Sequence, residues 1–292
     1  MKRLGYFIAL PFIYFISVMP FPLLYALSDA LYFLLYWVIG YRKEIVIGNL
    51  QRAFPEKSPD DLRQIAMSFY RYLCDLTLET LKTLTISPQG ALKHCYMDPA
   101  SIKLMDQLYA ENKNVILVLG HYGNWEWAGN AFSLTCKHPL YVIYHPLSNS
   151  YFDQLMIKIR TRFGTKLIAM KETFRKMTSL KSSVSAFGFI ADQTPSPEGA
   201  FWTTFLHQDT PVFKGTELMA SRFKYEVVFI SIKRHQRGRY EVFASASLDG
   251  SKAMQDGAIT LWHTQLLEKQ IIEDPSIWLW SHKRWKHTRP PQ

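Results

Sequence analysis

The chain has 292 residues, a formal net charge of +10 and a high share of hydrophobic (48%) and aromatic (15%) residues. This length fits one large α/β domain with a small appendage and is short for two independent catalytic domains. The positive charge indicates an anionic partner, for which nucleic acid, anionic lipid headgroups and an acidic carrier protein all qualify. Cys74, Cys95 and Cys136 form neither a Cys-x-x-Cys pair nor an even set. We therefore expect neither a disulfide framework nor a structural zinc site, and a reducing compartment fits best.

The N-terminal 41 residues are apolar enough to suggest a membrane anchor. Residues 4–27 carry no charged side chain, and the apolar character resumes over residues 30–41. The first run is long enough to cross the hydrocarbon core of a bilayer. A cleaved signal peptide is the alternative, because Lys2-Arg3 precedes the run and residues 26–28 form a weak cleavage site. We favour the anchor, since cleavage would send unpaired cysteines into an oxidising space.

Prolines leave the topology of this anchor open. Pro11, Pro20 and Pro22 would kink a spanning helix or make it shallow and interfacial.

A long helix is predicted after the anchor. Ser58 supplies a capping hydroxyl, Pro59 suits the first turn, and Asp60-Asp61 places negative charge at the positive helix end. We expect this helix to run to about Leu84 and to pack against the core through an apolar stripe. The stripe consists of Leu62, Ile65, Phe69, Leu73, Leu76 and Leu81.

From residue 114 the sequence alternates between short apolar runs and amphipathic segments. Strands are predicted at 115–119, 141–144, 187–191 and 227–232, and helices at 151–162, 173–181, 214–223 and 254–273. This alternation indicates an α/β fold with a mostly parallel central sheet covered by helices. The Pro-containing stretch 194–198 is expected to be a surface loop directly after a strand. In open α/β sheets, ligands bind at such strand ends.

The segment 120–126, Gly-His-Tyr-Gly-Asn-Trp-Glu, forms a predicted strand-to-helix corner that carries titratable groups. If it were all helical, His121 and Glu126 would lie about 140° apart around the axis. The geometry improves if His121 lies in a loop made flexible by Gly120 and Gly123, Asn124 caps the next helix, and Glu126 lies in its first turn. We then expect the Glu126 carboxylate to reach back to the imidazole.

Such a pair suits acyl transfer to a hydroxyl. A hydroxyl is a poor nucleophile until a base takes its proton, and a carboxylate stabilises the imidazolium that forms. The N-terminus of the following helix would also offer backbone N–H groups to a developing oxyanion. The alternative for this motif alone is a loop histidine near an unrelated surface glutamate.

Several motifs, in order, carry a resemblance to a known family. The segment 121–126 resembles the His-x-x-x-x-Asp/Glu motif of the lysophospholipid acyltransferase superfamily, and residues 49–290 resemble its branch of late lipid A acyltransferases. The further matching segments are Asn-Leu-x-x-Ala-Phe-Pro at 49–55, Tyr-His-Pro-Leu-Ser-Asn at 144–149, Arg-Thr-Arg-Phe-Gly at 160–164, Asp-Gln at 192–193 with Phe205 and 210–215, and the Trp-rich basic ending at 278–286. The resemblance implies a glycerolipid acyltransferase-like fold.

The resemblance also implies roles for individual residues. His121 is expected to be the general base and Glu126 its partner, with Asp192 and one arginine, Arg160 or Arg162, implicated in activity. We favour Arg160. Its guanidinium would pair with a substrate phosphate or polarise an acyl carbonyl, because it stays charged and forks onto oxygens. A solvated helix charge and a loop-capping aspartate are the structural alternatives.

Four more residues complete the predicted substrate site: Asn124, His145, Asn149 and Gln193. His145 departs from the family, which often has arginine there, and a neutral imidazole makes fewer charged contacts. The acceptor lipid can therefore differ from a lipid A precursor.

Two basic clusters are candidates for lipid phosphate or an acidic carrier protein: Lys233, Arg234, Arg237 and Arg239, then Lys283, Arg284, Lys286 and Arg289. The second cluster lies beside Trp278, Trp280 and Trp285, and tryptophan with cations suits a membrane interface. For Trp278 and Trp280 themselves, we favour a place in the core as residues of a final strand. We expect no nucleic-acid partner, since no recognisable binding module is present.

Taken together, residues 1–41 are predicted to be a membrane anchor and residues 42–292 an acyltransferase domain that faces the cytoplasm at a bacterial inner membrane. The resemblance implies acyl-acyl carrier protein as donor, an anionic glycolipid as acceptor, and neither a metal nor a separate cofactor. Direct attack by the acceptor hydroxyl is favoured, because the sequence has no Gly-x-Ser-x-Gly, His-Glu-x-x-His or P-loop motif. The alternatives are an acyltransferase for an aminolipid or lysophospholipid, a thioester hydrolase, and a non-catalytic membrane adaptor.

Overall fold

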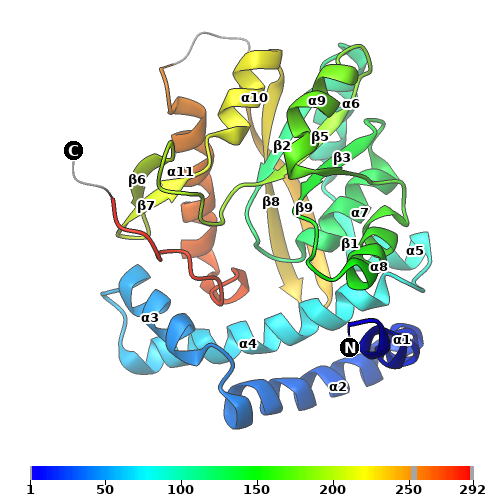
Figure 1. Cartoon of the computed structure of the whole chain (residues 1–292), viewed down its shortest axis with the longest axis vertical. Coiled ribbons are helices and arrows are strands. Elements are labelled where there is room, and N and C mark those ends of the chain that lie inside the picture. The colour runs from blue at the N-terminus through cyan, green and yellow to red at the C-terminus, as the bar shows by residue number, and fades with distance from the viewer. Residues whose placement is uncertain (1, 251–254, 290–292) are drawn as a thin grey trace.

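A seven-stranded sheet forms the centre of the protein in the computed structural model, which describes residues 2–250 and 255–289 (Figure 1). The strand order is β1-β9-β8-β2-β5-β3-β4, and neighbours are parallel except for the antiparallel pair β8 and β9. The strands are β1 (Cys95–Met97), β2 (Val115–Leu119), β3 (Leu140–Tyr144), β4 (Lys166–Ala169), β5 (Ala186–Ile190), β8 (Glu226–Gln236) and β9 (Arg239–Asp249). The predicted α/β fold with a mostly parallel sheet is confirmed.

Helices cover both faces of this sheet. Figure 1 shows α10 and α11 on one side and α6 and α7 on the other. Phe174 of α9 contacts Phe223 of α10, with ring centroids 5.7 Å apart, so α9 lies on the side of α10. These helices are α6 (Pro99–Ala110), α7 (Trp125–Thr135), α9 (Thr173–Ser179), α10 (Gly215–Phe223) and α11 (Ala258–Glu273). Two further helices contact strands of the sheet: α5 (Pro88–His94) contacts β1, and α8 (Ser150–Thr161) contacts β4. The short helices η2 (Met170–Glu172) and η3 (Pro275–Ile277) and the antiparallel hairpin of β6 (Phe201–Phe205) and β7 (Gln208–Val212) complete this part.

The sequence prediction located four strands within a few residues. Val115–Leu119 is a strand over its predicted bounds, and β3 and β5 each begin one residue earlier than expected. The prediction missed β1 and β4, which have three and four residues, and the long antiparallel β9. The final predicted helix begins at Ala258, and Met254, its predicted start, lies outside the described residues.

Helix α4 (Pro59–Lys82) runs beneath the sheet in Figure 1, and its predicted cap is confirmed. The Ser58 hydroxyl accepts a hydrogen bond from the backbone N–H of Asp61 at 3.2 Å. The stripe residues Leu62, Phe69 and Leu76 are buried, as expected for a helix that packs by one face against the core. Helix α3 (Lys43–Ala53) precedes it.

The N-terminal apolar run is not one continuous helix. It forms α1 (Lys2–Val18), α2 (Phe21–Phe33) and the π-helix η1 (Leu34–Ile39). Pro20, with φ −57° and ψ 147°, separates α1 from α2, because proline cannot donate the helical hydrogen bond and the chain there is extended. The uncharged run of residues 4–27 therefore belongs to two helices, with the break at one of the prolines that left its topology open. Among the described residues, one helical stretch, 21–39, is long and apolar enough to cross a membrane.

Candidate active site

A cleft opens where the parallel strands β2, β3 and β5 end. His121 follows β2, His145 follows β3, and Gln193 follows β5, so the carboxyl ends of three neighbouring strands bring these side chains to one edge. The empty volume of the cleft, including its open mouth, is about 1200 Å³. Other residues that line it are Trp125, Glu126, Asn130, Tyr144, Leu147, Arg160 and Met170.

Close packing fixes the loop that carries His121. A Cβ on Gly120 would come within 2.6 Å of the Leu267 side chain, and Gly123 has a φ of +57°, which favours glycine. The C-terminal segment from Ile277, the last residue of η3, to Leu279 holds this loop by two backbone hydrogen bonds. The Gly123 N–H donates to the Ile277 carbonyl at 2.9 Å, and the Leu279 N–H donates to the His121 carbonyl at 3.1 Å. The imidazole therefore sits on a backbone fixed from both sides.

The carboxylate that contacts the imidazole is Asp192. His121 Nδ1 lies 2.6 Å from Asp192 Oδ1, and the His121 backbone N–H donates to Asp192 Oδ2 at 2.8 Å. Trp278 Nε1 donates to the same Oδ2 at 2.8 Å. The predicted contact between the Glu126 carboxylate and the His121 imidazole is therefore wrong, because Asp192 occupies that position. The pairing of β2 with β5 brings residue 192 beside residue 121, although the two are 71 positions apart.

These donors keep Asp192 ionised. Burial is the largest single influence and raises the pKa of the Asp192 carboxyl, but the charge and hydrogen bonds of His121 and the indole of Trp278 together lower this pKa to about 2. An ionised carboxylate only accepts hydrogen bonds, so His121 donates through Nδ1. The lone pair of Nε2 is then available on the cleft side, where Gln193 Nε2 lies 3.4 Å away.

Glu126 pairs with Arg160 instead. Arg160 Nη2 lies 2.6 Å from Glu126 Oε1, and Arg160 Nε donates to Oε2 at 3.0 Å, which makes the ion pair bidentate. This pairing outweighs the effect of burial and raises the pKa of the Arg160 guanidinium above its ordinary value. Glu126 lies in the first turn of α7, as predicted, and both side chains line the cleft.

The other arginine points elsewhere. Arg162 donates through Nη1 to the carbonyls of Thr83 and Ile86, near the end of α4, and so satisfies backbone oxygens that the helix leaves unpaired. Of the two candidates, Arg160 is thus the arginine that lines the cleft.

The predicted polar substrate residues divide into two groups. His145 and Gln193 line the cleft. Asn124 caps α7, accepting from the Trp127 N–H at 2.9 Å, and Asn149 caps α8, accepting from the Tyr151 N–H at 3.1 Å. Asn124 is fully buried, and its amide donates to Glu79 at 2.8 Å, so both asparagines organise helix ends within the protein.

The tryptophan-rich ending belongs to the core. Trp278 and Trp280 are buried, which confirms the prediction that they are core residues. They do not form a regular strand, because Trp278 makes only an isolated bridge with Tyr122. Trp278 supports the site directly by donating to Asp192. The sequence contained this residue in the closing motif but gave no sign of its partner.

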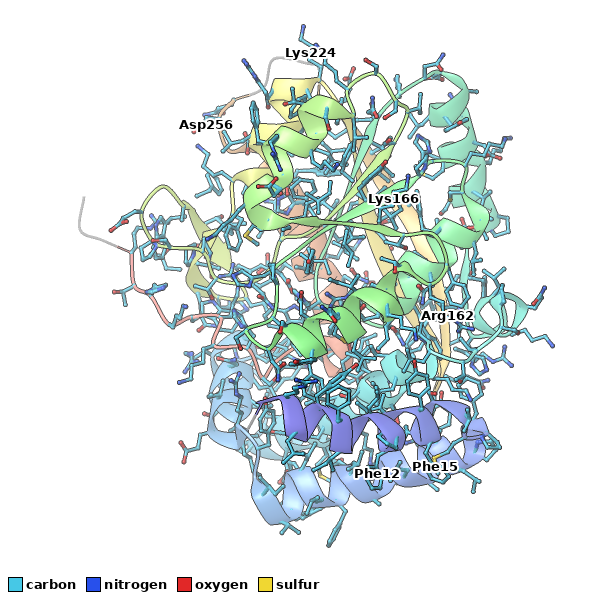
Figure 2. All side chains as sticks on the ribbon, turned by 45° about the vertical axis from the view of Figure 1, so that its right-hand side comes forward. Phe12, Phe15, Arg162, Lys166, Lys224 and Asp256 are labelled. Atoms are coloured by element: carbon cyan, nitrogen blue, oxygen red, sulfur yellow. The ribbon has the colours of Figure 1, made fainter. Side chains whose placement is uncertain are left out.

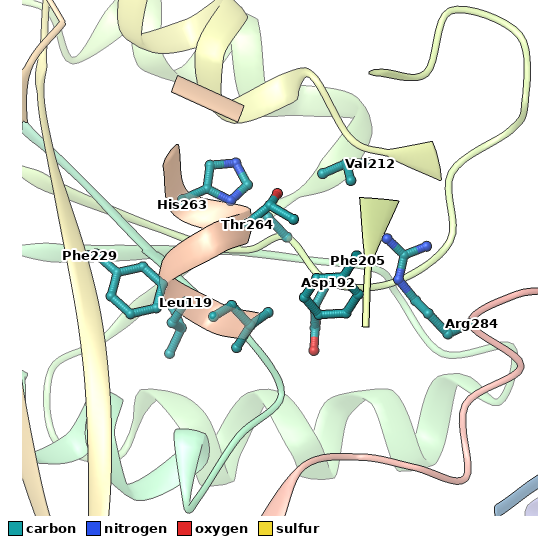
Figure 3. A pocket seen from close by; sticks show the side chains of 10 residues that line it. Leu119, Asp192, Phe205, Val212, Phe229, His263, Thr264 and Arg284 are labelled. Carbon is teal, nitrogen blue, oxygen red and sulfur yellow. The ribbon is translucent and has the colours of Figure 1, made fainter. Parts of the chain in front are cut away.

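One arginine from each basic cluster has partners within the protein. Arg237 forms ion pairs with Asp75 and Asp29, at 2.7 and 2.8 Å. Arg284 is 2% exposed. It lines a small cavity together with Asp192 and His263 (Figure 3). Its Nη2 donates to the Pro211 carbonyl at 2.8 Å, and burial lowers the pKa of Arg284 to about 10. Both arginines stabilise the fold: Arg237 is paired with two carboxylates at the surface, and Arg284 is buried.

An apolar cavity continues inward from the cleft. Its empty volume is about 450 Å³, and aliphatic, aromatic and glycine residues line it, including Leu117, Phe132 and Gly188. The cavity shares Trp125, Gly129, Val142 and Ile190 with the cleft, so the two spaces adjoin. The Trp125 ring also meets the His121 ring edge to face, with centroids 4.9 Å apart. In the described part of the chain, no group of three or more His, Cys, Asp or Glu side chains is placed to hold a metal ion.

An imidazole–carboxylate pair beside an apolar cavity, at the carboxyl ends of parallel strands, defines a site suited to a substrate with a hydrocarbon part. Comparison with known proteins identifies the family. The model of the bacterial lipid A biosynthesis acyltransferase family matches residues 1–287, and the chain belongs to this family. It is an acyltransferase of lipid A biosynthesis.

Curated relatives agree over nearly the whole chain. The chain is 21% identical to the lipid A biosynthesis palmitoleoyltransferase of Escherichia coli strain K12 over 274 residues, which is 93% of this chain and 87% of the relative. It is 22% identical to the lauroyltransferase of the same strain, with 93% and 88% covered. A Haemophilus influenzae lipid A biosynthesis acyltransferase is 23% identical, with 95% and 88% covered.

Proposed function

We propose that the protein transfers a fatty acyl chain from acyl-acyl carrier protein onto a hydroxyl of a lipid A precursor, with His121 as general base. The observation that carries this proposal is the hydrogen bond between His121 Nδ1 and Asp192, which leaves Nε2 facing a cleft that adjoins an apolar cavity. Two relatives are named for palmitoleoyl and lauroyl transfer, which supports an acyl chain as the transferred group.

In the proposed reaction, His121 Nε2 takes the proton of the acceptor hydroxyl as its oxygen attacks the carbonyl carbon of the thioester. The carbon–oxygen bond forms, and the carbonyl π electrons move onto oxygen. When this oxyanion collapses, the carbon–sulfur bond breaks. The departing thiolate receives the proton from the imidazolium, so the enzyme returns to its starting state. Asp192 holds the imidazole in the required tautomer and stabilises its positive form.

Glu126 takes a different part in this proposal. It holds the guanidinium of Arg160 in a fixed orientation at the cleft wall. Arg160 can then bind an acceptor phosphate or the developing oxyanion, because its charge persists at all physiological pH values. Gln193 lies close enough to His121 Nε2 to restrain the ring on the cleft side.

The apolar cavity is the proposed place for the acyl chain. Each methylene that leaves water there contributes roughly 0.8 kcal/mol, so even a medium chain gains several kcal/mol from burial. The net charge of +10 favours an acidic carrier protein as donor and an anionic glycolipid as acceptor. Such binding would take place at the cytoplasmic face of the inner membrane.

The direct test incubates the purified protein with acyl-acyl carrier protein and a lipid A precursor and identifies products by mass spectrometry. We expect acyl transfer to the precursor, and we expect His121→Ala to lower turnover by about three orders of magnitude or more without loss of folding. A folded His121→Ala enzyme with near-normal turnover would overturn the assigned base. Free fatty acid as sole product would identify a thioester hydrolase.

The acceptor needs its own comparison, because His145 lines the cleft at the position where the family often has arginine. An aminolipid and a lysophospholipid offered beside the lipid A precursor test this point. Higher kcat/KM with either one would identify that lipid as the acceptor and reject the precursor.

A further inference from the structure

We propose that the N-terminal helices lie flat on one leaflet of the bilayer and do not cross it. The contact is made by an N-terminal apolar surface on the outward sides of α1, α2 and η1. This surface consists of Leu4, Phe7, Ile8, Phe12, Phe15, Val18, Leu23, Phe33, Leu34, Trp37, Val38, Ile39 and Tyr41. The proposal does not depend on which residues catalyse the reaction.

Exposed apolar side chains are concentrated on this surface. Thirteen of the nineteen large exposed hydrophobic side chains of the described chain belong to residues 4–41. Phe12 is 65% exposed and Val38 63%. Phe12 and Phe15 lie on the side of α1 that faces away from α8 (Figure 2). A contiguous apolar surface of this kind is rare on monomeric soluble proteins and marks a contact with lipid or protein.

The opposite side of α1 is covered by the catalytic domain. Tyr6, Leu10 and Ile13, spaced three and four residues apart, pack against a buried cluster that includes Leu155 and Ile159 of α8. Lys158 of the same helix donates to the Tyr14 hydroxyl at 2.7 Å. Helix α1 is apolar all round, but only one of its faces is buried within the protein.

Polar contacts attach α2 to the domain. Ser28 is fully buried and donates to Asp75 at 2.6 Å, and the Tyr25 hydroxyl donates to Glu79 at 2.9 Å. Asp29 completes the set by pairing with Arg237 of the β8–β9 turn at 2.8 Å. These contacts lie on one side of α2, whereas the exposed apolar residues lie on the other.

The corner between the two helices is also attached. Lys82, the last residue of α4, donates to the Met19 carbonyl at 2.6 Å, and Thr85 donates to the Ser17 carbonyl. Neither helix therefore extends away from the domain as a membrane span would. Figure 1 shows α2 running beneath α4 along its length.

A crossing orientation would destroy this attachment. If α2 spanned the bilayer, the charged Asp29 side chain would enter the hydrocarbon, which is unfavourable for an ionised carboxylate. The buried carboxylates of Asp75 and Glu79 would also lose the hydroxyls of Ser28 and Tyr25. The flat orientation keeps every one of these contacts and buries only the outward side chains.

Basic groups among the aromatic side chains identify the occupant as a lipid surface with anionic headgroups. Trp37 is 47% exposed, and Lys43 and Arg63 both lie near its indole, at 5.6 and 5.9 Å from the ring centroid. An exposed indole with adjacent cations suits headgroup depth, where the cations meet the phosphates of an anionic leaflet.

This orientation brings the cleft to the lipid. Helix α1 packs on α8, and α8 carries Arg160 at the cleft wall. A glycolipid acceptor in the same leaflet would reach the cleft by lateral movement, without leaving the membrane entirely.

Topology provides the first test. Cells carry the full chain with an epitope tag at the N-terminus, or at the C-terminus as reference, and protease is added to spheroplasts or to inverted membrane vesicles. We expect both tags to survive in spheroplasts and to be digested in inverted vesicles. Digestion of the N-terminal tag in spheroplasts would mean that the chain crosses the membrane and would overturn the proposal.

A crossing hairpin of α1 and α2 would give the same tag result, so a second probe is needed. Met19→Cys at the corner is treated with a membrane-impermeant maleimide, with the wild-type protein as background for the native cysteines. We expect no added labelling from the periplasmic side and labelling only in inverted vesicles or detergent. Labelling in intact spheroplasts would place the corner across the bilayer and would also overturn the proposal.

The surface itself is tested with Phe12→Glu/Val38→Glu, and Leu218→Glu/Ile272→Glu is the matched control at similarly exposed apolar positions, 54% and 56%. Sedimentation with vesicles of phosphatidylcholine and phosphatidylglycerol measures binding, and acyl transfer in detergent micelles verifies folding. We expect at least a tenfold loss of vesicle binding for the N-terminal pair alone. Equal binding by the two variants would contradict the assigned surface.

Discussion

The carboxylates of Asp192 and Glu126 differ in surroundings and in partner. Asp192 follows β5, is 6% exposed, and accepts hydrogen bonds from His121 and Trp278. Glu126 lies five residues from His121 in the chain, yet it pairs with Arg160 of α8. Neighbours in the sheet determine which carboxylate reaches the imidazole, and closeness in sequence does not.

The largest effect is expected at Asp192. Asp192→Asn keeps the shape but presents an amide that can donate to Nδ1, which favours the wrong tautomer of His121. We expect kcat to fall by about 10⁴-fold with little change in KM, by analogy with the same exchange in a serine protease triad. Steady-state transfer assays over a range of acceptor concentrations measure this. A fall in kcat below tenfold would show that Asp192 does not orient the base.

A smaller loss is expected at Glu126. In Glu126→Gln the guanidinium of Arg160 keeps its charge but loses a charged, bidentate partner. A hydrogen bond to a charged group contributes roughly 1.5–3 kcal/mol, so we expect a 10- to 100-fold loss in kcat/KM.

The double variant Glu126→Gln/Arg160→Gln separates the two roles of these side chains. If Glu126 acts through Arg160, the double variant should lose little more than Arg160→Gln alone. Additive losses, or a Glu126→Gln variant as damaged as Asp192→Asn, would instead assign Glu126 a direct part in proton transfer.

Chain-length selection is expected to change at Gly129, where the cleft adjoins the apolar cavity. A Cβ there would meet only Leu140, at 4.0 Å, so a side chain has room to enter the cavity. We expect Gly129→Leu to lower kcat/KM for long acyl donors about tenfold relative to short ones, since shape mismatch in an apolar pocket costs about 1–3 kcal/mol.

Competition between donors of different length, analysed by mass spectrometry, measures this ratio. Gly129→Ala is the matched control and should keep the wild-type preference. An unchanged ratio in Gly129→Leu would place the acyl chain elsewhere.

Local sequence patterns predicted local structure well. The Ser58 cap, the strand at Val115–Leu119 and the Asn124 cap all depend on residues close together in the chain, and all are confirmed. The partners of His121 could not be predicted in the same way. Asp192 and Trp278 lie 71 and 157 positions from it, and their placement depends on the pairing of β2 with β5 and on the path of the C-terminal segment.

The N-terminal region shows the same limit. Apolar composition located the segment that carries most of the exposed large hydrophobic side chains of the described residues, but composition does not reveal which face of a helix the domain covers. Ser28, Asp29 and Tyr25 looked like a minor interruption of an apolar run, and in the folded chain they form the attachment of α2.

Glu79 connects this attachment to the catalytic corner. It is buried in α4 and accepts hydrogen bonds from Tyr25 of α2, Tyr240 of β9 and Asn124, the cap of α7. Burial is the main cause that raises the pKa of the Glu79 carboxyl to about 7, with the charge of Asp75 as a second cause. The three donors oppose this shift only in part, since they favour the ionised form.

The raised pKa of Glu79 implies a pH-dependent stability, which is the smallest expected effect. A carboxyl whose pKa is higher in the folded state binds more protons there than in the unfolded chain, so its contribution is complete below about pH 4.5 and is lost as pH rises through about 7. Histidines with lowered pKa values, such as His263 at about 4, oppose this trend below pH 6.5.

We therefore expect the difference in thermal midpoint between wild type and Glu79→Gln to favour wild type at pH 5 and to shrink or reverse at pH 8. Glu56→Gln removes an exposed carboxylate whose partner is Lys57, which stays charged from pH 5 to pH 8, and it is the control that should show no such crossing. If the wild-type advantage is the same at both pH values, Glu79 is not the group that titrates, and its connection between α2 and α7 is maintained in a single charge state.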